Sequence, residues 1–259
     1  MTAQPFPDQG ELFKASRESK NFHPEALIFF VHFYKGHKKA LKRHIQFVNS
    51  LGFDAYAFNL KDEIRQHEYL PYSTISKKFG LKHALADQIE EHLNLLTQYP
   101  QKIIFAFSNV SACAIEVMAR RPDLNFAGLI CDSGPAYDFV ASAFKLYTYA
   151  ERIPFWPLRK LVTPILAKGW STALHHDVPE DLKKLPQGFP VLSIRGWKDP
   201  LMSAADMDKI FQPCANLNWQ KLSLPEAKHL NGLRDFPDEY KPVVADFIAR
   251  LDLKKKSGS

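Results

Sequence analysis

Ser108, Asp199 and His229 of this 259-residue chain are of the types, and in the order, that nucleophilic catalysis by a serine needs. Ser108 follows the apolar run Ile103–Phe107 and precedes a second apolar stretch that predicts a helix. A strand that runs straight into a helix leaves the serine on a tight turn, near the positive end of the helix. A serine hydroxyl is a weak nucleophile until a histidine accepts its proton and a carboxylate orients that histidine. The order serine, aspartate, histidine along the chain therefore predicts a catalytic triad.

Each of these residues also has a structural interpretation. Ser108 suits the cap of the following helix, Asp199 lies in an Asp-Pro turn, and His229 lies in a loop. Two other residues compete for the catalytic roles. Ser111 is an alternative nucleophile, but one turn into the helix its hydroxyl is expected to bond back to a carbonyl. Asp132 follows a strand of its own and is the alternative acid.

The run His175-His176-Asp177 contains residue types that bind metals. Adjacent residues do not share a face, and no motif nearby supplies a third ligand, so we expect no metal site. Water completes the reaction of a serine triad, so we also expect no cofactor.

The elements that would position the triad alternate between short apolar strands and longer helices. Continuous apolar runs predict strands that are buried on both faces, and spacings of three or four residues predict helices. The predicted strands cover residues 26–32, 53–60, 102–107, 126–132, 190–196 and 219–224. The predicted helices cover residues 37–50, 81–97, 109–120, 204–211 and 238–251, with an irregular connection over 62–79. This alternation predicts the α/β class, with a doubly wound and mostly parallel sheet.

Residues 136–187 interrupt the alternation with a segment rich in aromatic residues and proline. We interpret them as a helical cap inserted into a core formed by residues 1–135 and 188–259. Ligands of open parallel sheets bind beyond the carboxyl ends of the strands, where the triad would meet. Five aromatic residues are expected to form the interior of the cap and to line a substrate site there: Phe139, Phe144, Phe155, Trp156 and Trp170.

Composition narrows the range of partners and compartments. The net charge is +6, but the positive residues are spread out and no nucleic-acid-binding motif accompanies them, so we expect no nucleic-acid partner. Three cysteines make no disulfide framework, and residues 1–24 contain no apolar signal region, so we expect a cytoplasmic protein. Residues 139–170 are interrupted by charges and prolines and do not predict a membrane span. Peripheral contact of the cap with anionic lipid stays open as an alternative.

Residues 26–251 resemble the α/β-hydrolase superfamily in the order of the triad and in three further segments. These segments are Arg120–Asp123, Gly128–Ser133 and His229–Pro237. The resemblance implies an esterase-, lipase- or thioesterase-like serine hydrolase that acts through an acyl-enzyme, and the aromatic, aliphatic cap favours an apolar acyl group. An amide substrate has less support. A non-catalytic relative that uses the fold to bind a ligand is the alternative.

That alternative arises because the turn around Ser108 departs from the family pattern. The pattern is G-x-S-x-G, whereas this chain has alanine at position 106 and Val110 at the second glycine. A β-branched residue crowds the turn, which would narrow the pocket or distort the elbow. By the same resemblance, the backbone N–H groups of Asn109 and Phe33 are expected to form an oxyanion hole, with Tyr34 as a second choice beside Phe33. The expected substrate pocket comprises Tyr34, Val110, Phe139, Phe144, Trp156 and Trp170.

Overall fold

A mostly parallel sheet forms the centre of the molecule. The computed structural model describes residues 6–17, 21–61, 71–151, 153 and 155–253. Within these residues, seven strands pair in the order β1-β3-β2-β4-β5-β6-β7. The strands are β1 (Glu11–Phe13), β2 (Ala26–Val31), β3 (Asp54–Ala57), β4 (Gln101–Phe107), β5 (Phe126–Asp132), β6 (Phe189–Gly196) and β7 (Leu217–Leu224). Every pairing is parallel except that of β1 with β3. The α/β class predicted from the sequence is confirmed.

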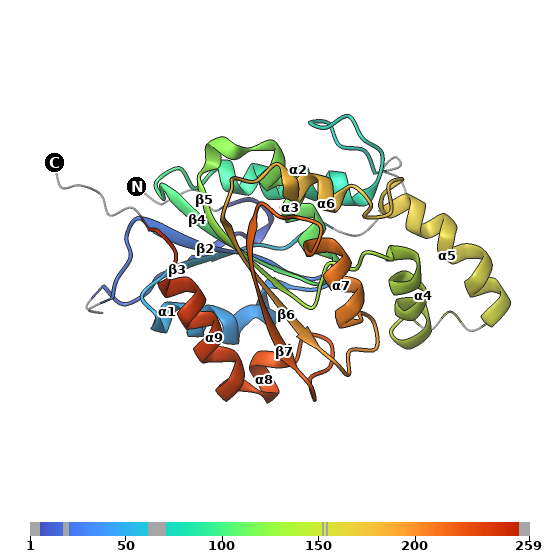
Figure 1. The fold of residues 1–259 in the computed structure, drawn as a ribbon. Coiled ribbons are helices and arrows are strands. Elements are labelled where there is room, and N and C mark those ends of the chain that lie inside the picture. Colours follow the sequence, from blue (N-terminus) through green and yellow to red (C-terminus); the bar gives the residue numbers. More distant parts are fainter. Residues whose placement is uncertain (1–5, 18–20, 62–70, 152, 154, 254–259) are drawn as a thin grey trace.

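Helices cover both faces of the sheet (Figure 1). One face carries α1 (Lys42–Ser50), α8 (Gly232–Asp235) and α9 (Pro237–Ala249). The other carries α2 (Leu81–Asn94), α3 (Ser111–Arg120), α6 (Val178–Lys183) and α7 (Ala204–Phe211). Between β5 and β6, α4 (Phe139–Tyr149) and α5 (Trp156–Trp170) lie beyond the carboxyl ends of the strands. The helices α4, α5 and α6 fall within residues 136–187, the segment that we interpret as a cap.

The apolar strand sequences explain this layered arrangement. Side chains of β2 alternate between two clusters, with Leu27, Phe29 and Val31 on the α2–α3 face and Ala26, Ile28 and Phe30 on the α1–α9 face. All six residues are fully buried. A strand with helices on both faces has no side for polar residues, which is why its sequence is a continuous apolar run.

Several boundaries differ from those predicted. The segment 37–50 contains a 3₁₀ turn, Lys38–Leu41, before α1 begins, and the strand predicted over 53–60 covers only Asp54–Ala57. The edge strand β1 and the short helix α8 had no counterpart in the prediction. Of the predicted connection over 62–79, residues 62–70 lie outside the described residues, and Tyr72 bridges Phe79 in the remainder.

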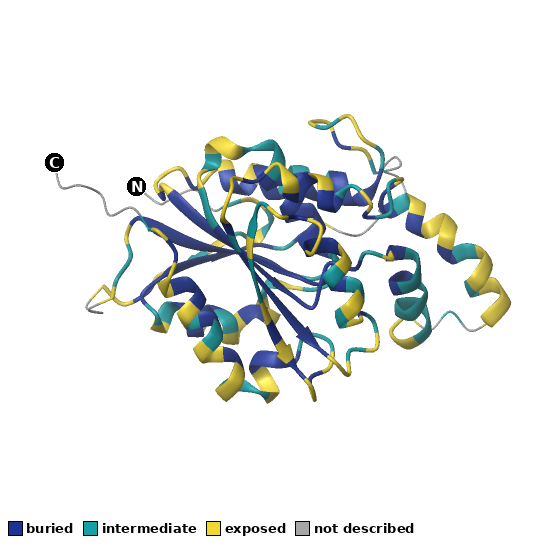
Figure 2. Ribbon diagram, viewed as in Figure 1, coloured by how far each residue is buried: buried dark blue, intermediate teal, exposed yellow. Residues whose placement is uncertain are grey.

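The helix α5 corrects one expectation about the cap interior. Its inner face carries Thr163, Ala167 and Trp170, which are buried. Phe155 and Trp156 are exposed, because the first turns of α5 extend past the elements packed beneath its C-terminal half (Figure 2). None of the helices in the part of the chain that the structure describes has the length and hydropathy needed to span a bilayer.

Candidate active site

Ser108 occupies a strained turn directly after β4. Its φ is +56°, in the left-handed region that non-glycine residues seldom adopt. The strand anchors this turn, because Phe107 stacks on Phe105 at 5.0 Å and on Phe30 at 6.4 Å between ring centroids. The turn passes through a short 3₁₀ segment, Ser108–Val110, into α3. Backbone strain of this kind aims the hydroxyl away from the sheet and toward the loops beyond it.

The structure brings Ser108, His229 and Asp199 together. The Ser108 Oγ lies 3.1 Å from Nε2 of His229, and Nδ1 of His229 lies 2.7 Å from Oδ2 of Asp199. The carboxylate favours the tautomer that carries its hydrogen on Nδ1, which leaves Nε2 to accept the serine proton. The Asp199 side chain is almost fully buried, and the imidazole is 18% exposed. The ring is therefore sheltered but reachable.

Hydrogen bonds from backbone N–H groups to side-chain oxygens fix the two loops that carry Asp199 and His229. Oδ1 of Asp199 accepts hydrogen bonds from the N–H groups of Leu201 and Met202, at 2.8 and 3.0 Å. Oδ1 of Asn231 accepts one from the Lys228 N–H at 2.7 Å, closing a turn around His229. The carboxylate and the imidazole are thus held by their own loops before any ligand arrives.

Asp132, the alternative acid, is engaged elsewhere. Its Oδ1 accepts a hydrogen bond from Ser133 Oγ at 2.8 Å, and its Oδ2 accepts one from the Tyr240 hydroxyl at 2.7 Å. Burial raises the pKa of this carboxyl, and the two hydrogen bonds partly oppose that rise. Ser133 Oγ also accepts a hydrogen bond from the N–H of Leu230, next to His229. Asp132 therefore supports the histidine loop and does not contact the imidazole by a hydrogen bond.

Ser111, the alternative nucleophile, points back into the helix. Its hydroxyl donates to the carbonyl of Ser108. The residue is fully buried. The back-bonding expected from its position in the helix is confirmed, and of the two serines Ser108 is the one hydrogen-bonded to His229.

The loop expected to complete the oxyanion hole is held by His32. Its Nδ1 donates to the carbonyl of Phe33 at 2.8 Å, and its Nε2 accepts from the N–H of Leu60 at 2.9 Å. Acceptance from Leu60 needs a neutral ring, and burial lowers the pKa of His32. The N–H of Gly36 donates to the carbonyl of Phe33 at 2.8 Å, so the loop turns sharply after that residue. Sequence reasoning placed Phe33 and Tyr34 in this loop but missed the role of His32.

The side chain of Asn109 connects the serine turn to α4 and to the segment between β5 and α4. Its Nδ2 donates to Ser142 Oγ at 3.1 Å, and its Oδ1 accepts from the N–H of Ala136 at 3.0 Å. The amide is thereby committed to α4 and the chain before it. The expected oxyanion role falls to the backbone N–H of Asn109, because the side chain holds these two contacts.

Val110 does not distort the turn. Its φ and ψ are −67° and −17°, ordinary helical values, and its side chain is fully buried in the cluster on the α2–α3 face. The tight contact is made instead by Gly134, where an added Cβ would lie 2.2 Å from the carbonyl oxygen of Ser108. A glycine from the end of β5 thus provides the close approach for which the family pattern uses glycines beside the serine. Its place in the run Ser133-Gly134-Pro135, directly after a strand, was the available signal in the sequence.

The expected pocket residues are brought together only in part. Phe139 stacks on Trp170 at 5.3 Å, and Tyr34 meets the edge of Trp170 at 6.1 Å. Tyr34 packs against the buried cluster that contains Val110, Phe139 and Trp170. Phe144 is half-buried on α4. The expectation for Trp156 is wrong: this residue is 53% exposed at the start of α5, outside the cluster.

The run His175-His176-Asp177 does not form a metal site. Nδ1 of His175 donates to the carbonyl of Ala136, and its Nε2 accepts from the Trp170 indole N–H at 2.8 Å, so the buried ring orients the aromatic cluster. Burial lowers the pKa of His175 to about 3. Asp177 pairs with the buried Lys82 at 2.6 Å. Among the described residues, no group of three or more His, Cys, Asp or Glu side chains is arranged to hold a metal ion.

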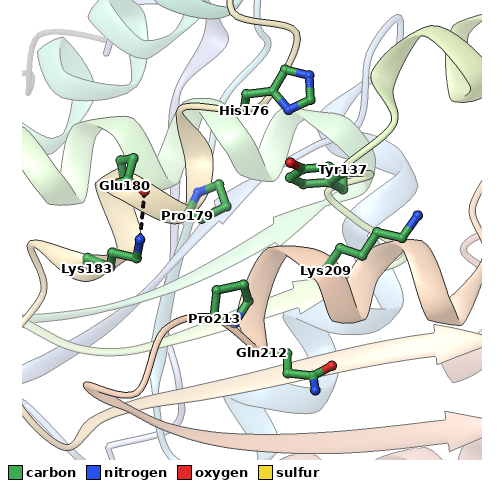
Figure 3. A pocket seen from close by; sticks show the side chains of 8 residues that line it. All are labelled: Tyr137, His176, Pro179, Glu180, Lys183, Lys209, Gln212 and Pro213. Carbon is green, nitrogen blue, oxygen red and sulfur yellow. Dashed lines mark hydrogen bonds and ion pairs between the residues drawn. The ribbon is translucent and has the colours of Figure 1, made fainter.

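An open hollow lies between α6 and α7 (Figure 3). Its lining comprises Tyr137, His176, Pro179, Glu180, Lys183, Lys209, Gln212 and Pro213. No triad residue contributes to it, and Lys183 is already paired with Glu180 at 2.7 Å.

Comparison of the sequence with protein-family models and with curated proteins gives no match. Solved structures do match. An esterase from Pyrococcus furiosus is 18% identical, with a TM-score of 0.61 over 88% of this chain and 81% of the other. An esterase from Thermogutta terrifontis is 14% identical, with a TM-score of 0.60 over 92% and 93% of the two chains. An epoxide hydrolase from Bacillus megaterium is 19% identical, with a TM-score of 0.58 over 93% and 96%.

Proposed function

We propose that this chain, which has the α/β-hydrolase fold, is a serine hydrolase that cleaves an ester or thioester of an apolar acyl group. The observation that carries the proposal is the hydrogen-bonded series from Ser108 through His229 to Asp199, with the serine at a positive φ. Two of the similar structures are esterases, which agrees with this reaction class.

In the proposed first step, Ser108 Oγ attacks the acyl carbonyl while Nε2 of His229 takes its proton. The imidazolium that forms is stabilised by Asp199, which holds Nδ1–H in place. Negative charge on the carbonyl oxygen is stabilised by the backbone N–H groups of Asn109 and Phe33. Collapse of the tetrahedral intermediate breaks the bond to the leaving group, which takes the proton from His229. An acyl-serine remains.

In the second step, His229 takes a proton from water, and the resulting oxygen nucleophile attacks the acyl-serine. Collapse returns the proton to Ser108 and releases the carboxylic acid. Atoms and protons balance over the cycle without a cofactor. The pocket for the acyl group is proposed at the aromatic cluster of Tyr34, Phe139 and Trp170, because these rings lie on the segments that follow β2 and β5.

A series of p-nitrophenyl esters with increasing chain length tests the proposal. We expect hydrolysis by the wild-type protein, with kcat/KM rising as the acyl chain lengthens. Ser108→Ala should abolish turnover while the thermal midpoint stays close to that of the wild type. A folded wild-type protein that hydrolyses none of the esters or their thioester analogues would contradict the proposal and favour the non-catalytic binding module.

A further inference from the structure

Six large apolar side chains on α5 and on the residue before it are exposed to solvent. Trp156 shares the helical stripe of Thr163 and Trp170 but lies beyond the elements that cover that stripe. We name Phe155, Trp156, Leu158, Leu161, Ile165 and Leu166 the α5 apolar face. Leu161 is 69% exposed and Ile165 is 66% exposed. Other exposed large apolar residues of the described chain are scattered, whereas these six fall within twelve consecutive positions. A contiguous exposed apolar patch of this kind marks an interaction surface.

The fold fixes the direction in which this face points. Residues Thr163, Ala167 and Trp170 recur at helical spacing and pack inward, so Leu158, Leu161 and Ile165 are turned outward on the opposite side. Figure 1 shows α5 projecting at the periphery of the molecule, and Figure 2 shows that its outer half is exposed. The face is therefore presented away from the sheet.

Charges on α5 have one sign. The helix carries Arg159, Lys160 and Lys168 and contains no aspartate or glutamate. The Lys160 amine lies over the Trp156 ring, 4.1 Å from its centroid. The nearest acid along the chain, Glu151, is paired with Lys35 at 2.9 Å. Basic side chains beside Trp and Leu are the combination that suits the boundary between lipid headgroups and acyl chains.

This charge pattern selects between two occupants. A second copy of the chain, docked through the same face in two-fold symmetry, would place these cations against their own counterparts. An anionic lipid surface would attract them and accept the apolar residues between them. The helix has 15 residues, about 22 Å in length, which is short of the roughly 30 Å of a bilayer core. It would lie along the membrane surface and would not cross the bilayer.

We propose that the α5 apolar face docks the protein peripherally on anionic membranes. Leu161 and Ile165 enter the acyl-chain boundary, and Lys160 and Lys168 contact the anionic headgroups. The docking does not depend on the proposed hydrolase activity, because it involves none of the triad residues. Apolar burial and charge attraction act together, and both are needed for stable attachment at an interface.

Co-sedimentation with vesicles tests the proposal. The full chain is mixed with vesicles of phosphatidylcholine alone or with about a third phosphatidylserine. We expect binding to the anionic vesicles that weakens as salt is raised, and little binding to the neutral ones. The double variant L161S/I165S should bind the anionic vesicles about tenfold or more weakly, because two apolar side chains no longer enter the interface.

A matched control makes the same two changes elsewhere on the surface. Ile75 is 50% exposed and Leu95 is 43% exposed, and neither lies near α5 in sequence. We expect I75S/L95S to bind like the wild type, and Ser108→Ala to do the same, which separates docking from catalysis. Equal binding by L161S/I165S and the wild type would overturn the proposal. So would a wild-type dimer in sedimentation that becomes monomeric in L161S/I165S without any vesicle binding.

Discussion

Replacing Gly134 by alanine should damage catalysis by moving the nucleophile. An added Cβ would lie 2.2 Å from the carbonyl oxygen and 2.3 Å from the carbonyl carbon of Ser108, whereas real Cβ atoms essentially never come closer than 3.0 Å. Because both are backbone atoms, a rotamer change cannot relieve the contact, and the turn must shift by about 1 Å. A displacement of that size costs about 100-fold in rate. That factor corresponds to about 2.7 kcal/mol of activation free energy.

The assay is kcat/KM for a p-nitrophenyl ester, measured together with the thermal midpoint. Gly169→Ala is the matched control, because nothing lies within 4 Å of its added Cβ. It lies inside α5, so the control should gain up to about 1 kcal/mol of stability and keep full activity. A Gly134→Ala protein that folds and retains wild-type kcat/KM would show that the close approach to Ser108 does not set the serine's position.

Three further predictions follow from the buried polar groups. Asp199→Asn should lower kcat about 10³-fold or more, because an amide group facing Nδ1 favours the tautomer with its hydrogen directed at Ser108; an unchanged kcat in steady-state kinetics would remove Asp199 from the triad. Burial lowers the pKa of His44 to about 3 from 6.5, so the unfolded chain takes up a proton that the native protein excludes as pH falls below 6.5. Between pH 7 and pH 5, the free energy of unfolding of the wild type should therefore fall by about 2 kcal/mol more than that of His44→Phe, as measured by urea unfolding. The variant His176→Gln, at an exposed histidine, should show the same fall as the wild type. Lys82→Met should cost about 3–5 kcal/mol in the same assay, since it leaves Asp177 and Glu116 without their buried cation, while Lys183→Met at the exposed pair with Glu180 should leave stability nearly unchanged.

The parts of the fold that were predicted correctly are those with strong local signals. Strand β2 is a continuous apolar run, and β4, β5 and β6 are largely apolar, because helices cover both of their faces. The edge strand β1 was missed because it has three residues, Glu11–Phe13, and alternates too briefly to give a pattern. Its place beside β3 depends on pairing across more than forty positions, which local sequence does not encode.

The site shows the same division between local and distant information. The three triad residues could be selected because each follows a strand and their order along the chain is informative. The contacts of the His32 ring and of the Asn109 side chain join segments far apart in sequence, so no local spacing indicated them. For Gly134 the sequence offered only its place directly after a strand, and not the approach to Ser108. Trp156 was misplaced because an aromatic residue at its helical position suits a buried face. Its exposure depends on how far α5 extends beyond the elements that pack against it.

Labelling with a fluorophosphonate probe tests the central claim most directly. The probe reacts with a serine only when an adjacent base activates the hydroxyl. We expect one covalent adduct on the wild-type protein, mapped by mass spectrometry to Ser108 and not to Ser111, and no adduct on Ser108→Ala or on His229→Ala. Absence of labelling on folded wild-type protein, or an adduct that persists in Ser108→Ala, would contradict the account.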